Sequence, residues 1–206
     1  MSSISKDGIF LLSDPKLPSL ATLIAGGPIK GSWWGHPKGG LIFNISMDLA
    51  QDSKILPVKL INGKVTFIHR KLWGALQSVA TCNEGWQLQG LKRQEATLLR
   101  IVQLQNEIRS DDRRLKGGPS AVAKLAKALE SKLLIYSEES HSSTGKHVRV
   151  MKSWKQVFRE RRFASPPIPM KKAKSTFERI ASQWEFSYGT PVKLPWSMRS
   201  RSSGPS

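Results

Sequence analysis

The sequence predicts an α+β protein: a small β-hairpin and helix module, then a winged-helix-like module with a basic carboxyl-terminal tail. Two observations carry this prediction: a strong hairpin signal in the first half, and an order of helix, loop, helix and hairpin in the second. The boundaries we expect are 1–19 for a flexible amino terminus, 20–85 for the first module, 86–160 for the second and 161–206 for a tail partly packed on the core.

In the first module, residues 19–25 predict a short helix that ends at Gly26-Gly27-Pro28, and residues 41–50 predict a second helix. The segments 56–61 and 64–69 are rich in β-branched and aromatic residues. Asn62-Gly63 lies between them, and this dipeptide supplies the two positive φ angles that a type I′ turn needs. Residues 70–80 follow with apolar side chains at helical spacing.

In the second module, helical spacing predicts a long helix over 89–108 and an amphipathic helix over 120–133, with Ser120 as its N-cap. Two strands are expected at 134–138 and 147–151, with a basic turn between them as a wing. A winged-helix domain places its recognition helix where 120–133 lies. The other interpretation is a helical hairpin with a small sheet, used for packing or for binding a protein.

Charge indicates the class of partner. The 206 residues include 33 Lys and Arg against 15 Asp and Glu, a net charge of +18. A protein this basic usually meets a polyanion, and nucleic acid is the first candidate. The second half of the chain holds 21 of the basic residues against 9 acidic ones. The alternative is a solvated basic surface without a specific partner.

We therefore expect a nucleic-acid-binding protein, with double-stranded DNA as the partner and with Lys and Arg contacting its phosphates. The residues expected to bind lie on the second helix of this module, at the wing or in the returning strand: Lys124, Lys127, Lys132, Lys146, His147, Arg149 and Lys152. A third interpretation is a protein-interaction module.

A second group of residues suggests an alternative function. Trp33, Trp34 and His36 lie in a glycine-rich segment, and His69 and Arg70 lie at a strand-to-helix junction. If the fold brought them into one pocket, paired indoles would stack on bases and the two histidines would form an acid–base pair. That arrangement would favour a small enzyme or repair-type factor. The competing interpretation is that the tryptophans are core anchors, and no motif identifies a catalytic residue.

Several classes of protein are excluded. The single cysteine, Cys82, leaves no internal disulfide and no cysteine-based zinc site, and we expect neither metal nor cofactor. No run of 18 apolar residues is present, so no membrane-spanning helix is expected. Residues 1–30 lack the features of a secretory signal, which favours an intracellular location, in the nucleus or the cytoplasm.

The tail holds three prolines among residues 166–169, which favours an extended linker over 164–174. Lys171-Lys172-Ala173-Lys174 resembles a nuclear-localisation patch. Six aromatic or branched residues within 175–196 predict that this piece packs back on the core, and 197–206 are expected to be disordered.

One pattern resembles a known group of sequences. Trp33-Trp34-x-His36-Pro37-x-Gly39 is followed by Lys59-Leu60-x-x-Gly63-Lys64-Val65-Thr66-x-x-His69-Arg70-x-Leu72-Trp73. Further along the chain stand Leu133-Leu134-x-Tyr136, His141-x-x-x-Gly145-x-His147 and Trp154. Together these motifs are similar to those of small uncharacterised proteins, mainly bacterial, whose carboxyl-terminal part is winged-helix-like. The resemblance covers about residues 31–158 and implies one fused unit of the two modules. It implies no activity and no catalytic residue.

Overall fold

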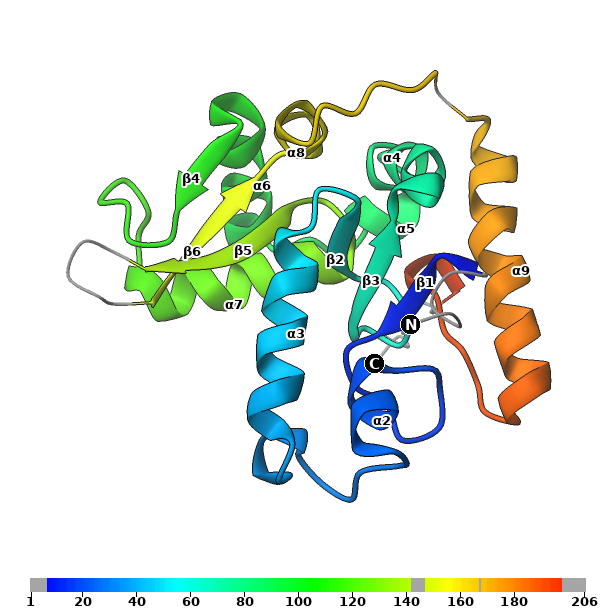
Figure 1. The fold of residues 1–206 in the computed structure, drawn as a ribbon. Coiled ribbons are helices and arrows are strands. Elements are labelled where there is room, and N and C mark those ends of the chain that lie inside the picture. The colour runs from blue at the N-terminus through cyan, green and yellow to red at the C-terminus, as the bar shows by residue number, and fades with distance from the viewer. Residues whose placement is uncertain (1–6, 142–146, 167, 198–206) are drawn as a thin grey trace, which may run out of the picture. The chain divides into compact units, whose positions relative to one another are not determined.

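The computed structural model describes residues 7–141, 147–166 and 168–197 and confirms the predicted α+β class (Figure 1). The chain forms two compact units: Met1–Leu76 together with Ile168–Ser206, and Gln77–Pro167. We call them unit 1 and unit 2. Residues 168–197, which lie in the expected tail, therefore belong to the same unit as the described amino-terminal residues.

Unit 1 contains an antiparallel sheet with the strand order β1-β3-β2. Its strands are β1 (Ile9–Leu11), β2 (Ile55–Lys59) and β3 (Val65–His69). Sequence reasoning misses β1, because it expects residues 1–19 to be flexible. All three residues of β1 are buried, and a strand this short shows no alternation from which it could be recognised.

The turn between β2 and β3 has the predicted conformation. Asn62 and Gly63 both have positive φ, at 53° and 66°. β2 ends at Lys59 rather than at the expected Ile61. The Ile61 amide donates to the Thr66 hydroxyl (3.1 Å), a side-chain bond that takes the place of strand pairing at this position.

The helices of the first 80 residues lie close to their expected positions. They are α2 (Leu20–Ala25), η1 (Trp33–Gly35), α3 (Gly39–Gln51), η2 (Arg70–Leu72) and α4 (Trp73–Ala80), where η denotes a 3₁₀ turn. Ser19 caps α2 by accepting a hydrogen bond from the Thr22 amide (3.3 Å). α4 continues from unit 1 into unit 2.

The core of unit 1 is built on its sheet. Phe10 of β1 stacks on Phe67 of β3, with ring centroids 5.0 Å apart, and Leu20 and Ile55 pack with them. Trp73 is fully buried, which leaves its indole N–H without access to water; that group donates to the Ile68 carbonyl (3.0 Å).

The tail contains the longest helix of the described residues, α9 (Met170–Tyr188), so the expected extended linker over 164–174 is wrong in its second part. Pro169 is the N-cap residue, a position where the missing proline N–H breaks no helical hydrogen bond. The buried side chains recur at helical spacing: Ala173, Phe177, Ile180, Ala181 and Trp184.

The segment after α9 is held by the hairpin turn of unit 1. The Asn62 amide donates to the Lys193 carbonyl (2.8 Å), and the Lys193 amide donates back to the Asn62 side-chain oxygen (2.7 Å). The Asn62 side-chain nitrogen also donates to the Pro191 carbonyl (3.4 Å). Val192 and Leu194 are buried beside it. The turn therefore has a second role, as an anchor for the carboxyl-terminal segment.

Unit 2 contains an antiparallel sheet of order β4-β6-β5, with helices before, within and after it. Its elements are α5 (Gly85–Leu88), α6 (Arg93–Gln105), β4 (Glu107–Arg109), α7 (Gly118–Ser131), β5 (Tyr136–His141), β6 (His147–Lys152) and α8 (Trp154–Glu160). The core joins α6, α7 and the sheet through residues such as Val102, Leu129 and Met151.

Several boundaries in unit 2 differ from the expected ones. The helix expected over 89–108 begins at Arg93. It ends at Gln105, because Asn106 takes a positive φ of 64° and β4 then pairs with β6. α7 begins at Gly118, so its N-cap is Gly117 and not Ser120. β5 begins at Tyr136 instead of 134.

Candidate nucleic-acid interface

The outward face of α7 carries small polar and cationic side chains. Ser120, Lys124, Lys127 and Ser131 are all exposed. They follow one another at intervals of four, three and four residues, which places them within an arc of about 60° on a helix of 3.6 residues per turn. We call these four residues the α7 stripe. Among the residues that the structure describes, no carboxylate forms an ion pair with either lysine of the stripe.

The opposite face of α7 fixes the direction of the stripe. Val122, Ala126 and Leu129 are almost completely buried in the core of unit 2. They pack with Leu98 and Val102 of α6. Because one face of α7 is held by this core, the α7 stripe is presented by a rigid helix and not by a loop.

The segment before α7 adds positive charge. Arg113 and Lys116 are exposed. Both aspartates of the segment already have partners, since Arg114 lies 2.5 Å from Asp112 and Arg109 lies 3.0 Å from Asp111. The hydrogen bond from Arg114 lowers the pKa of Asp112 to about 2. The aspartates therefore compensate Arg109 and Arg114, and Arg113 and Lys116 contribute net positive charge beside the helix.

Arg149, expected to contact phosphate, is instead bound within unit 2. Its guanidinium lies 2.5 Å from Glu130 of α7 and 3.5 Å from Glu139 of β5. It also donates to the Ser137 hydroxyl (3.1 Å), which itself bonds to Glu130. Only 24% of the Arg149 side chain is exposed. This residue braces α7 against the hairpin and has little surface left for a ligand.

Lys152 is also committed to internal contacts. Its ammonium lies 2.6 Å from Glu138, 2.8 Å from Glu160 and 3.7 Å from Glu107. Burial alone would lower the pKa of Lys152, but the hydrogen bonds to Glu138 and Glu160 outweigh it and raise that pKa above its usual value. Lys152 thus joins β4, β5, β6 and α8.

The remaining expected residues divide into two groups. Lys132 is partly buried, and its ammonium donates to the Gln89 carbonyl (2.6 Å). Lys146 lies outside the described residues, and of His147 only the backbone, in β6, is described. Of the seven residues expected to bind nucleic acid, the structure therefore brings Lys124 and Lys127 together on an exposed face. Ser120, Ser131, Arg113 and Lys116 were missed, although the spacing of the stripe is visible in the sequence.

The structure does not bring together the two histidine segments that the alternative function requires in one pocket. His36 precedes the first residue of α3, whereas His69 pairs in register with Ile55, which follows the last residue of α3. The 13 residues of α3 separate the two by about 20 Å along its axis. An acid–base pair of His36 and His69 is therefore wrong.

Each histidine instead has a local structural role. The Lys38 amide donates to Nδ1 of His36 (3.1 Å), and the Lys71 amide donates to Nδ1 of His69 (3.2 Å). The bond to His69 occupies the Lys71 amide, which lies at the helix start and could otherwise donate to an anion. The Arg70 guanidinium lies over the Trp73 ring, 5.2 Å from its centroid.

Trp33 and Trp34 are not core anchors. The two rings stack with centroids 4.2 Å apart and planes inclined by 23°. Trp34 is 63% exposed and also lies 5.3 Å from the Phe43 ring of α3. We call these three side chains the indole platform.

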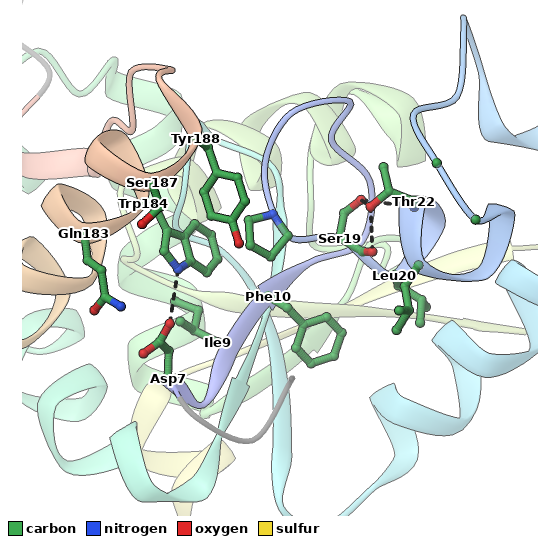
Figure 2. Close-up of a pocket in the computed structure, with 14 residues that line it drawn as sticks. Asp7, Ile9, Phe10, Ser19, Leu20, Thr22, Gln183, Trp184, Ser187 and Tyr188 are labelled. Carbon is green, nitrogen blue, oxygen red and sulfur yellow. Dashed lines mark hydrogen bonds between the residues drawn. The ribbon is translucent and has the colours of Figure 1, made fainter. Parts of the chain in front are cut away.

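A cavity of about 540 Å³ opens in unit 1 between the amino-terminal residues and α9 (Figure 2). Phe10, Trp184 and Tyr188 supply aromatic walls, and Ser19 and Thr22 supply hydroxyls. The Trp184 indole N–H donates to the Asp7 carboxylate (3.3 Å), as Figure 2 shows. The volume of the cavity and its mixture of polar and apolar lining residues are typical of a small-molecule site. The lining holds no histidine, cysteine or lysine.

Two further features bear on function. In the part of the chain that the structure describes, no three His, Cys, Asp or Glu side chains gather into a group able to hold a metal ion. None of the described helices is both long enough and apolar enough to cross a membrane.

Comparison with known proteins gives no match: no family model, no curated protein and no solved structure is significantly similar to this chain. The expected resemblance to uncharacterised bacterial proteins stays a prediction.

Proposed function

We propose that the protein binds nucleic acid, with duplex DNA as the ligand, through the α7 stripe of unit 2. The observation that carries this proposal is the stripe itself: two lysines and two serines on one exposed helix face, with no carboxylate among the described residues in ion-pair contact with either lysine. Lys and Ser are side chains that contact phosphates, and the major groove of duplex DNA is wide enough to admit an α-helix.

The net charge supports the same proposal. Unit 2 carries 17 Lys and Arg against 9 Asp and Glu, a net charge of +8, and unit 1 carries 16 against 6, a net charge of +10. Both units therefore attract a polyanion over distances of about a Debye length, roughly 10 Å at 0.1 M salt. The stripe would supply the contact surface.

The order of elements supports a winged-helix-like arrangement for unit 2. The chain runs α6, β4, α7, β5, β6, and β6 lies between β4 and β5 in the sheet. In this arrangement α7 occupies the place of a recognition helix. The segment between β4 and α7 forms turns where a helix-turn-helix has an additional helix. α7 packs on α6.

Direct binding assays test the proposal. Fluorescence anisotropy with labelled duplex DNA, single-stranded DNA and RNA at about 50 mM salt should show binding that weakens steeply as salt rises. The variant Lys124→Glu/Lys127→Glu should lose at least about tenfold in duplex affinity, because each reversal removes a phosphate contact and adds a repulsion. Its melting temperature should stay near that of the parent, since both side chains are exposed.

A matched control is Arg100→Glu/Lys155→Glu, which reverses two exposed cations of the same unit, on α6 and α8, and changes the net charge by the same amount. Equal losses from the α7 variant and from this control would indicate a diffuse charged surface. Failure of the parent protein to bind any of the three nucleic acids at micromolar concentration would refute the proposal.

A further inference from the structure

The indole platform is an exposed aromatic surface in unit 1. Trp34 is 63% exposed and Phe43 is 39% exposed, and Met47, one turn further along α3, is 43% exposed. Of the 13 residues in α3, only Gly39 and Ile42 are buried. Apolar side chains in such a cluster contact water at a cost in free energy, and exposed clusters of this kind mark binding surfaces.

The backbone holds the platform in place. The Ser32 hydroxyl accepts a hydrogen bond from the Trp34 amide (3.4 Å), and the His36 amide donates to the Trp33 carbonyl (3.1 Å). Gly39 is required where α3 begins, because a Cβ atom there would lie 2.9 Å from the carbonyl oxygens of both Trp33 and Trp34. The first turn of α3 thus lies directly against the backbone of the stacked pair, which pre-organises the two indole rings.

The positive charge around the indole platform indicates the class of ligand that it binds. Lys30 and Lys38 are exposed on either side of the tryptophan pair in the sequence, and the Lys38 ammonium is held at the Ile24 carbonyl (2.8 Å). Unit 1 as a whole has a net charge of +10. A second copy of this chain would bring +18 against +18, which opposes self-association. An anionic ligand with flat, apolar faces satisfies both the rings and the lysines.

We propose that the indole platform stacks on the bases of single-stranded nucleic acid, while Lys30 and Lys38 lie near its phosphates. This inference rests on the proposed function, because it names a second ligand form for a nucleic-acid-binding chain. Stacking on aromatic side chains accepts any base, so the platform would bind without sequence specificity. Its contribution per base corresponds to an affinity gain of about 5- to 150-fold.

An experiment that separates stacking from charge uses two labelled probes of equal length and charge. One is an oligothymidylate of about 15 nucleotides, near the upper site size of single-strand-binding folds, and the other is the same backbone without bases. The parent protein should bind the oligothymidylate at least about fivefold more tightly than the abasic strand. Trp34→Ala should abolish this preference and leave the affinity for the abasic strand unchanged.

Two variants serve as controls. Phe186→Ala removes an aromatic side chain of the same unit that is 93% exposed but lies outside the platform, and it should keep the preference. Trp34→Phe retains an aromatic ring and should keep part of the preference for the oligothymidylate. The melting temperature of each variant reports whether unit 1 stays folded.

The outcomes distinguish this inference from the proposed function. Lys124→Gln/Lys127→Gln should weaken duplex binding while the ratio of oligothymidylate to abasic affinity is retained; loss of that ratio would assign base contact to α7 instead. Equal affinity of the parent for the two single strands would overturn the inference. It would also be overturned if Trp34→Ala spared the ratio but abolished binding to vesicles of anionic phospholipid.

Discussion

The two hairpins of the molecule are stabilised in different ways. In the hairpin of β2 and β3, two adjacent residues, Asn62 and Gly63, set the turn, and Asn62 also binds the carboxyl-terminal segment. In the hairpin of β5 and β6, Arg149 and Lys152 bind carboxylates of α7, β4, β5 and α8. The first is specified by local chain conformation, and the second by charges from distant parts of the sequence.

This difference matters for function. Arg149 and Lys152 belong to the most basic stretch of the chain, 146–174, which holds ten basic residues and one acidic one. Their partners Glu107, Glu130 and Glu138 lie before that stretch, so a count along the sequence does not show that the charges are compensated. Two cations of the most basic stretch, Arg149 and Lys152, are therefore bound internally, whereas Lys124 and Lys127 of α7 are exposed.

The largest effect is expected from Lys152→Ala. Lys152 is almost completely buried, and its removal leaves three carboxylates close together without a cation. Breaking a fully buried ion pair costs about 3–5 kcal/mol, and because these carboxylates are about 40% exposed we expect about 2–3 kcal/mol. Urea denaturation measures the loss. Lys155→Ala, an exposed lysine of α8, should change the free energy of unfolding by less than about 0.5 kcal/mol.

A smaller effect is expected from Gly63→Val in the first hairpin. Valine at a φ of 66° meets a steric penalty on the order of 1–2 kcal/mol. Thermal unfolding should show a lower melting temperature for this variant. A matched control is Gly40→Val in α3, where φ is not positive and a Cβ atom would meet open space. If both variants melted at the same temperature as the parent, the turn would not be a determinant of the first hairpin.

Lowering the pH should reduce the free energy of unfolding by a still smaller amount, through the carboxylates that bind Lys152 in the second hairpin. Burial would raise the pKa of Glu160, but the hydrogen bond from Lys152 lowers it below its usual 4.5. A carboxyl with a lowered folded-state pKa stabilises the fold above its usual pKa, and this stabilisation is lost as the pH falls through the folded value. Because Glu160 is 39% exposed, we expect about 0.5–1 kcal/mol.

The measurement that checks this is the free energy of unfolding of the parent and of Lys152→Ala at about pH 6 and about pH 3. The difference between the two proteins should shrink at the lower pH. A difference independent of pH would show that the ion pairs of Lys152 do not contribute to stability.

The sequence predicts the parts of the fold that have local causes. The turn at Asn62 and Gly63 and helices α2, α3 and α7 follow from dihedral preference and apolar spacing. β1 and β4 were missed because three-residue strands are defined by their partners in the sheet. The start of α9 is not predicted, because the prolines at 166–169 favour an extended chain, although the spacing of Phe177, Ile180 and Trp184 is typical of a helix.

The candidate site was only partly predictable for the same reason. Lys124 and Lys127 follow from the amphipathic pattern of one helix, which a sequence shows directly. The internal roles of Arg149 and Lys152, and the distance between His36 and His69, depend on tertiary contacts that no local pattern encodes.

The most direct test of the account is the salt dependence of duplex DNA binding, measured for two double variants below their melting temperatures. The logarithm of the affinity falls with the logarithm of salt concentration with a slope of about −0.9 per phosphate neutralised. Lys124→Gln/Lys127→Gln should make this slope less steep by about 2. Arg149→Gln/Lys152→Gln should leave it unchanged, because both cations already bind carboxylates. The reverse result would contradict the assignment of the interface to α7.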